Sequence, residues 1–165
     1  MWIFKTGSPE ATFAFGCSLA SVLLDGDIVC LQGDLGMGKT VFVQGIARGL
    51  DVKEAVTSPT FTILNIYEGK TKLYHFDLYR LETPEELEDI GFDEYTSAGG
   101  VAVIEWPDKF PDRLPAECLW VKLEAGEQIA DRFISVRAQG ERYEKLGEEL
   151  KHIADSCYRY SHTCV

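Results

Sequence analysis

The chain has no apolar run long enough to cross a lipid bilayer. A membrane-spanning helix needs about 18 or more consecutive apolar residues, and no segment of the 165 residues approaches that length. The first residues, MWIFKTGSPEA, have no apolar stretch behind a basic one, so no secretory signal peptide is expected there. These absences argue against membrane insertion and export, and we expect a cytoplasmic protein without a membrane partner.

Cysteine shows no pairing pattern. The five cysteines, at positions 17, 30, 118, 157 and 164, are odd in number and form no C-x-x-C motif. This spacing is typical of neither a zinc site nor a disulfide framework, and it suits a reducing compartment. We therefore expect free thiols, either buried or scattered over the surface.

Basic residues are also scarce. The chain has 16 Lys and Arg against 27 Asp and Glu, which gives a net charge of −11. An acidic surface repels phosphodiester backbones, so a large direct contact with nucleic acid is not expected. Proteins and small phosphorylated ligands remain compatible with this charge, because a pocket can be locally positive on an acidic body.

The pattern of apolar residues predicts a single α/β domain over residues 1–165. Strand-like and helical runs alternate in the first half, and most of the second half is strand-like. This order indicates a mainly parallel central sheet with added antiparallel strands and helices on both faces, a three-layer fold. The expected strands cover 1–6, 28–32, 61–67, 70–79, 101–106, 118–124 and 132–138, and the expected helices 9–24, 41–50, 84–90 and 141–160.

One segment has the spacing of a phosphate-binding loop. GDLGMGKT (33–40) fits G-x-x-x-x-G-K-[ST] at Gly33, Gly38, Lys39 and Thr40, between a predicted buried strand and a predicted helix. Glycines let backbone N–H groups converge on a phosphate, and the helix N-terminus adds positive potential. We expect Lys39 to reach the β- and γ-phosphates and the Thr40 hydroxyl to bind Mg²⁺. The alternative, a glycine-rich turn with a surface lysine, does not account for the flanking strand and helix.

Two acids near the ends of apolar strands are candidates to complete the Mg²⁺ site. Glu105 follows VAVI, a compact apolar run typical of a central parallel strand. Asp77 lies in a hairpin strand with alternating aromatic residues, which indicates a more peripheral place. The pattern thus favours Glu105 as the main metal-binding acid. A structural role for either acid stays open, and for Arg80 we favour an ion pair with Asp77 over a role in charge neutralisation.

The segment TSPT (57–60) lies in the loop after the expected helix 41–50. A hydroxyl or N–H in such a loop can gain a hydrogen bond only when a γ-phosphate is bound, which is how switch loops become ordered. An ordinary turn in which Pro59 fixes φ is the alternative. Trp106 is compatible with stacking on a ligand or with burial at a strand end. His75 has no companion at metal-ligand spacing, so we expect a structural histidine.

The segments GDLGMGKT, SPTFT (58–62), HFDLYRL (75–81) and IEWPD (104–108) together make the chain resemble the bacterial TsaE family, also called YjeE. The resemblance covers about residues 5–138, and the four segments are specific in this order and spacing, although only the first is specific alone. The family consists of small P-loop ATPases needed for the threonylcarbamoyladenosine modification of tRNA. It implies a P-loop NTPase-like fold, ATP and Mg²⁺ as ligands, and TsaB and TsaD as partners through which tRNA is reached. The helical tail at 139–165 matches no family motif, and its role stays open.

The resemblance also implies roles for single residues. Thr60 is the expected γ-phosphate sensor of the switch-like loop, Glu105 belongs to the Mg²⁺ shell, and Asp77 belongs to the catalytic surroundings. The residues expected to hold the nucleotide are Gly33, Asp34, Leu35, Gly36, Met37, Gly38, Lys39, Thr40 and Val41. The residues expected to act in catalysis are Lys39, Thr60, Asp77 and Glu105, with Ser58, Pro59, Arg80 and Trp106 around them.

Three functions are compatible with these residues. The first is an ATPase that depends on other proteins, because the chain has only 7 Arg and none is placed as a self-contained arginine finger. The second is a small-molecule kinase, which would need a lid over the phosphates. The only insertion that could serve, 82–99, is strongly acidic, and its negative charge would repel a triphosphate. The third is a binding module gated by nucleotide, in which hydrolysis is incidental.

Overall fold

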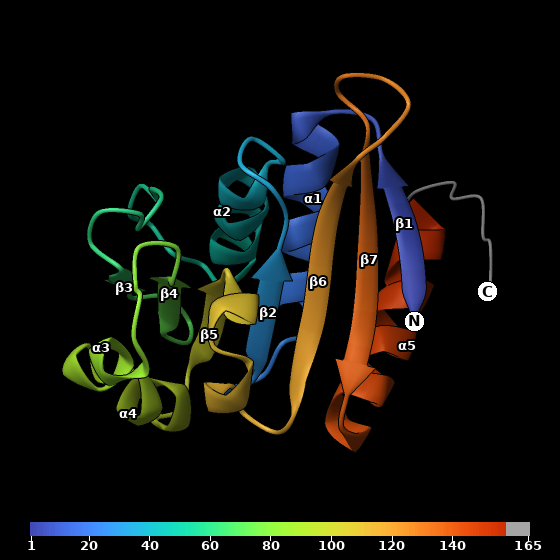
Figure 1. Ribbon diagram of the computed structural model, residues 1–165. Helices are drawn as coiled ribbons and strands as arrows, with labels where there is room; N and C mark the ends of the chain where they lie inside the picture. Colours follow the sequence, from blue (N-terminus) through green and yellow to red (C-terminus); the bar gives the residue numbers. More distant parts are fainter. Residues whose placement is uncertain (158–165) are drawn as a thin grey trace.

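A seven-stranded sheet runs through the middle of the molecule in the order β1-β7-β6-β2-β5-β4-β3 (Figure 1). The computed structural model describes residues 1–157, with side chains up to residue 154. The strands are β1 (Trp2–Thr6), β2 (Ile28–Gln32), β3 (Leu64–Tyr67), β4 (Leu73–Asp77), β5 (Val101–Glu105), β6 (Cys118–Ala125) and β7 (Arg132–Gln139). The helices are α1 (Pro9–Ala20), α2 (Lys39–Gly49), α3 (Pro84–Asp89), α4 (Phe92–Ser97) and α5 (Glu141–Cys157).

The four central strands β6, β2, β5 and β4 are parallel to one another. β2 pairs with both β5 and β6, and β5 pairs with β4 on its other side. The runs IVCLQ and VAVIE are buried along almost their whole length, as expected for strands covered on both faces. β3, β7 and β1 extend the sheet through antiparallel pairings. The predicted fold class, a mainly parallel sheet with antiparallel additions, is confirmed.

The predicted hairpin of β3 and β4 is present, but the expectation that β4 is peripheral was wrong. All five residues of β4 are buried, and β3 alone forms the edge of the sheet beside it. The aromatic side chains of β4 do not face solvent. Tyr74 packs against Tyr95, and Phe76 packs against Phe92, so these aromatics form the interface with α4.

Helices cover both faces of the sheet (Figure 1). Side chains of α1, α2 and α5 form one core cluster with one face of the strands, and side chains of α3 and α4 form a second cluster on the other face. α1 begins as predicted, because the Ser8 hydroxyl accepts a hydrogen bond from the Ala11 N–H and Pro9 occupies the first turn. It ends at Ala20, four residues before the predicted end, and α4 was not predicted.

Helix α5 is part of this packing. Tyr143, Leu146, Leu150 and Ala154 are buried in the cluster that α1 and α2 share. The Tyr143 hydroxyl accepts a hydrogen bond of 2.8 Å from the Ile28 N–H at the start of β2. The predicted helix end near residue 160 lies outside the described residues. None of the helices within residues 1–157 is both long and apolar enough to cross a membrane.

Candidate functional site

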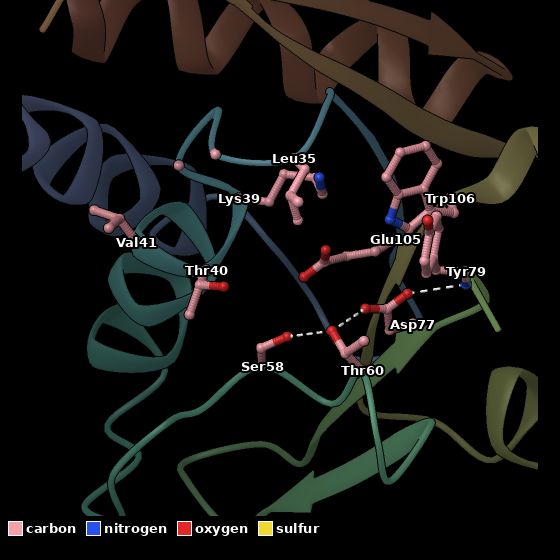
Figure 2. A pocket seen from close by; sticks show the side chains of 12 residues that line it. Leu35, Lys39, Thr40, Val41, Ser58, Thr60, Asp77, Tyr79, Glu105 and Trp106 are labelled. Carbon is pink, nitrogen blue, oxygen red and sulfur yellow. Dashed lines mark hydrogen bonds between the residues drawn. The ribbon is translucent and has the colours of Figure 1, made fainter.

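The phosphate-loop segment and both candidate acids lie around one cavity of about 390 Å³ (Figure 2). Its walls come from the loop after β2, the start of α2, the loop before β3 and the ends of β4 and β5. The lining residues are Leu35, Gly36, Gly38, Lys39, Thr40, Val41, Ser58, Thr60, Asp77, Tyr79, Glu105 and Trp106.

Parallel pairing explains why distant segments meet here. β2, β4 and β5 run in the same direction, so their carboxyl ends lie at the same edge of the sheet, where ligands of open α/β sheets bind. Glu105 is in register with Leu31 of β2 on one side and with Asp77 of β4 on the other. The two acids and the loop that follows β2 are therefore neighbours because of the sheet itself.

The phosphate loop leads directly into α2. Gly38 precedes the helix with φ of 93°, a left-handed conformation that favours glycine, and an added Cβ there would meet nothing within 4 Å. Because glycine has no side chain to cap the helix, the first N–H groups of α2 are available to an anion. Lys39 is 7% exposed, and its Nζ donates to the carbonyl oxygens of Gly33 at 2.6 Å and Asp34 at 3.1 Å.

Arg132, at the start of β7, binds backbone carbonyls of the same loop. Its Nε donates to the Met37 carbonyl at 2.9 Å and its Nη2 to the Gly36 carbonyl at 3.4 Å. The neighbouring Asp131 does not share this role, since its carboxylate pairs with Lys5 at 2.9 Å. That hydrogen bond from Lys5 lowers the pKa of Asp131, which keeps the carboxylate ionised.

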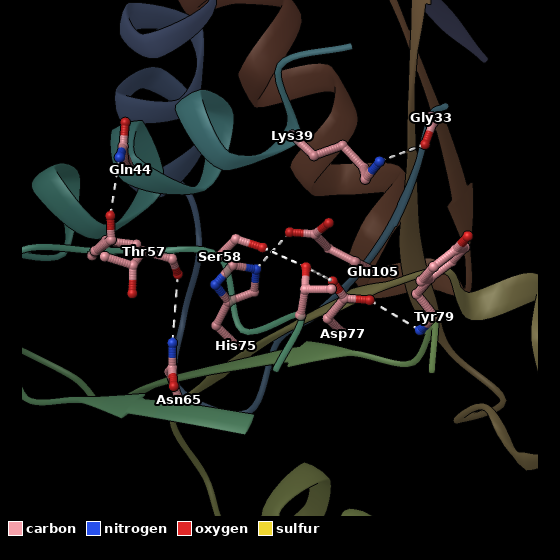
Figure 3. Close-up of polar contacts among 12 residues, drawn as sticks. Gly33, Lys39, Gln44, Thr57, Ser58, Asn65, His75, Asp77, Tyr79 and Glu105 are labelled. Carbon is pink, nitrogen blue, oxygen red and sulfur yellow. Dashed lines mark hydrogen bonds and ion pairs between the residues drawn. The ribbon is translucent and has the colours of Figure 1, made fainter. Parts of the chain in front are cut away.

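The two acids differ in how many of their oxygens are already engaged. Glu105 Oε1 contacts His75 Nε2 at 2.7 Å, and within the described residues Oε2 has no hydrogen bond (Figure 3). Asp77 uses both oxygens, because Oδ1 accepts from the Tyr79 N–H at 2.9 Å and Oδ2 accepts from the Thr60 hydroxyl at 2.8 Å. Glu105 thus keeps a free oxygen beside the cavity, whereas Asp77 anchors the loop that precedes β3.

That loop is tied to Asp77 through a short relay of hydroxyl groups. The Thr60 hydroxyl donates its hydrogen bond to Asp77. In the 2.7 Å contact between Ser58 Oγ and Thr60 Oγ1 the donor is therefore Ser58. Pro59, between these two residues, is buried, and its carbonyl accepts from the Ile63 N–H at 2.6 Å. Ile63 has φ of 67°, which is a strained conformation for a β-branched residue.

Trp106 covers one side of the cavity. It adopts φ of 57° directly after β5, and its ring lies 4.8 Å from Lys39 Nζ and 5.0 Å, between centroids, from the ring of Tyr79 (Figure 2). A lysine over the face of an indole gains cation–π attraction. Trp106 both lines the cavity and packs, partly buried, against the second core cluster, so stacking on a ligand stays a prediction.

Some predicted site residues lie elsewhere. The expected ion pair between Arg80 and Asp77 was wrong: Arg80 is exposed and its guanidinium lies 5.2 Å from the Phe61 ring centroid. Arg80 lies beyond the end of β4, and both carboxylate oxygens of Asp77 accept hydrogen bonds from Thr60 and Tyr79 instead. Gly33, Asp34 and Met37 line a second cavity, of about 450 Å³, on the other side of the phosphate loop.

The cavity offers the donors that Mg²⁺ and a triphosphate require. The Thr40 hydroxyl and the free Glu105 oxygen are hard oxygen donors, which Mg²⁺ prefers. The N-terminus of α2 and the Lys39 ammonium supply positive charge for phosphate oxygens. The residues that line the cavity therefore fit Mg²⁺ and a triphosphate, and Thr40 and Glu105 are the side chains that would hold the ion.

The sequence did not single out Tyr79 or Arg132, and it did not predict the partner of His75. His75 lies two residues before Asp77 in the same strand. Because residues two apart in a strand point to the same face, strand alternation alone could have put His75 on the face of the acids. A structural role was predicted for His75; its side chain is fully buried, and its imidazole contacts Glu105. Nothing in the sequence marks Arg132, because its partners are backbone carbonyls on a distant loop.

Comparison with known proteins agrees with the geometry. Residues 6–134 match the family model described as threonylcarbamoyl adenosine biosynthesis protein TsaE. The tRNA threonylcarbamoyladenosine biosynthesis protein TsaE of Bacillus subtilis is 44% identical over 149 residues, which are 89% of this chain and 92% of that protein. The protein of the same name from Treponema pallidum is 43% identical over 116 residues, which are 70% and 86% of the two chains.

A solved structure shows the same fold. The crystal structure of Bacillus subtilis YdiB superposes with a TM-score of 0.81 at 36% identity, and the match covers 92% of this chain and 97% of that one. The family match takes in the phosphate loop, the Ser58–Thr60 loop, Asp77 and Glu105. Family model, relatives and solved structure agree, and the chain belongs to the TsaE family.

Proposed function

We propose that this chain is an accessory ATPase of tRNA N6-threonylcarbamoyladenosine biosynthesis, which binds ATP with Mg²⁺ and hydrolyses it in support of TsaB and TsaD. The pathway follows from the names of the relatives, and the ATPase step from the site. Contact with tRNA is indirect, in keeping with the net charge of −11. A cytoplasmic location follows from this role.

One observation carries the ATPase proposal: the phosphate loop and an acid with a free oxygen face the same cavity. Lys39 and the N-terminus of α2 bind the β- and γ-phosphates, and Thr40 and Glu105 hold the ion. Bound Mg²⁺ neutralises charge on the phosphate oxygens. Thr60, fixed by Asp77, lies on the loop that would contact the γ-phosphate, so this loop distinguishes ATP from ADP.

The adenine base fits a third cavity, of about 340 Å³, that adjoins the phosphate loop at Gly36 and Gly38. This cavity has mostly apolar walls from the start of α1, the start of α2 and the turn between β6 and β7, which suits a flat heteroaromatic ring. Its other residues are Pro9, Thr12, Met37, Val41, Ile129, Ala130 and Arg132.

The position of residues 82–99 weighs against the kinase alternative. Leu87 and Phe92 of this segment are buried against the sheet face opposite α1 and α2, in the second core cluster. Glu86 caps α3 by accepting from the Thr83 N–H at 2.8 Å, so the segment is a docked helical pair. To close over phosphates, these two helices would have to leave the core into which Leu87 and Phe92 are packed.

The test is an ATPase assay of the purified chain, alone and with TsaB and TsaD. We expect slow hydrolysis by the chain alone, faster hydrolysis with both partners, and none after Lys39→Ala. Lys145→Ala is the matched control, because Lys145 is an exposed lysine on α5 that forms an ion pair with Glu141, far from the phosphate loop in the sequence. ATP binding without hydrolysis in any combination would favour the nucleotide-gated module, and no stimulation by the partners would count against the accessory role.

A further inference from the structure

The contact between His75 and Glu105 lies deep in the sheet. His75 is in the middle of β4 and 0% exposed, and Glu105 ends β5 at 3%. The two side chains share the sheet face that α2 covers, and His75 Nε2 lies 2.7 Å from Glu105 Oε1 (Figure 3). This hydrogen bond joins two strands and reaches a carboxylate that lines the nucleotide cavity.

The geometry defines where the imidazole carries its hydrogen. Glu105 offers a carboxylate oxygen, so Nε2 donates the hydrogen bond. Nδ1 is buried and has no hydrogen-bond partner within the described residues. The hydrogen that this contact needs is therefore the one on Nε2.

Packing alone does not account for a histidine at this place. The residue beside it on β5 is Val103, and the core around it is apolar. An aliphatic side chain would fill the site without leaving a buried nitrogen unpaired. Within the described residues, the only hydrogen bond of the imidazole is the one with Glu105, so its polar character acts through that acid.

We propose that His75 is a positioning residue for Glu105. Its N–H occupies Oε1, which fixes the rotamer of the carboxylate and leaves Oε2 toward the cavity beside Thr40. An ion-binding carboxylate held in this way loses less freedom when it binds Mg²⁺. This inference rests on the proposed function, since it holds that His75 strengthens Mg²⁺ binding at the ATP site through Glu105.

Two substitutions separate the hydrogen bond from the packing. His75→Gln keeps an N–H donor at about the place of Nε2, and His75→Leu removes the donor at similar volume. Outer-shell partners of metal ligands typically contribute about 10–100-fold to metal affinity. We therefore expect His75→Leu to raise the Mg²⁺ concentration for half-maximal ATP binding by about tenfold or more, with His75→Gln close to wild type. Calorimetric titration of ATP at graded Mg²⁺ measures both, and ATP binding in EDTA should be equal in all variants.

Val103→Ala is the control for a loosened core. It opens a cavity next to His75 without touching a polar group, so it should lower the melting temperature and leave the Mg²⁺ dependence unchanged. A second measurement needs no nucleotide: the imidazole ¹⁵N resonances of the wild-type chain should show hydrogen on Nε2. A bare Nε2 would overturn the inference, and so would equal Mg²⁺ dependence of the Leu and Gln variants. Failure of the wild type to bind ATP would instead overturn the proposed function, while the ¹⁵N result would still decide whether the pair exists.

Discussion

Asp77 and Glu105 lie directly opposite each other at the ends of the parallel strands β4 and β5. Both are 3% exposed, and both line the cavity of about 390 Å³ beside the phosphate loop. Their hydrogen bonds nevertheless give them separate tasks. Asp77 is saturated by Thr60 and the Tyr79 N–H, whereas Glu105 keeps Oε2 free. Equivalent positions in the sheet thus give one acid with an oxygen left free for a ligand and one acid that holds a loop.

The first prediction concerns these two tasks. Glu105→Gln removes the charge that would face Mg²⁺, so we expect the Mg²⁺ requirement for ATP binding to rise by about tenfold, or about 1.4 kcal/mol. Asp77→Asn should leave that requirement nearly unchanged and lower the hydrolysis rate, because the amide cannot accept from both the Thr60 hydroxyl and the Tyr79 N–H equally well. Binding and turnover measured at graded Mg²⁺ separate the two effects. Identical profiles for the two variants would contradict the division of roles.

The second prediction concerns the Thr60 hydroxyl. Thr60→Val preserves the shape of the side chain and removes its hydrogen bonds to Asp77 and Ser58. If this loop responds to the γ-phosphate, ATP turnover should fall by about tenfold or more, while the affinity for ADP should stay within about twofold. Thr60→Ser retains the hydroxyl and should behave like wild type. An equal loss of ATP and ADP affinity in the Val variant would show that the loop does not sense the γ-phosphate.

Much of this site is visible in the sequence because its chemistry is local. GDLGMGKT sets the phosphate loop through spacing alone, and the apolar run before Glu105 identifies a central strand. The order and type of most elements follow from the same periodicity. These features depend on residues that are close in the chain, where backbone geometry and side-chain alternation leave few options.

The contacts that the sequence did not predict join residues far apart in the chain. His75 and Glu105 are 30 positions apart, and they meet only because β4 pairs with β5. The aromatic residues of β4 were interpreted as a peripheral pattern because the helix that covers them, α4, was not predicted. Arg132 and Met37 are 95 positions apart, and the partner of Arg132 is the Met37 backbone carbonyl. Since every residue has a backbone carbonyl, the sequence does not show which one an arginine binds.

The third prediction concerns Arg132. Its guanidinium donates to carbonyl oxygens of Met37 and Gly36, so it stabilises the shape of the phosphate loop. Hydrogen bonds from a charged donor contribute about 1.5–3 kcal/mol each at most, and we expect Arg132→Met to weaken ATP binding about tenfold, or about 1.4 kcal/mol. Arg137→Met is the control, because Arg137 lies on the same strand, is exposed and contacts the Trp120 ring. Calorimetric titration of ATP compares them; unchanged affinity in Arg132→Met would show that the loop keeps its shape without this residue.

The fourth prediction concerns the attachment of α5 to the sheet through Tyr143. Its hydroxyl accepts from the Ile28 N–H, so Tyr143→Phe leaves a buried donor unpaired and should lower the free energy of unfolding by about 1–3 kcal/mol near pH 8. Burial raises the pKa of Tyr143 to about 12, above the value of about 10 for an exposed tyrosine. Because the folded pKa is the higher one, this stabilisation is complete below pH 10 and is lost as the pH rises toward 12. The advantage of wild type over Tyr143→Phe, measured by urea unfolding, should therefore shrink above pH 10. Tyr95→Phe removes a hydroxyl that has no hydrogen bond within the described residues and should show no such convergence; a constant difference between wild type and Tyr143→Phe up to pH 11 would contradict the assignment.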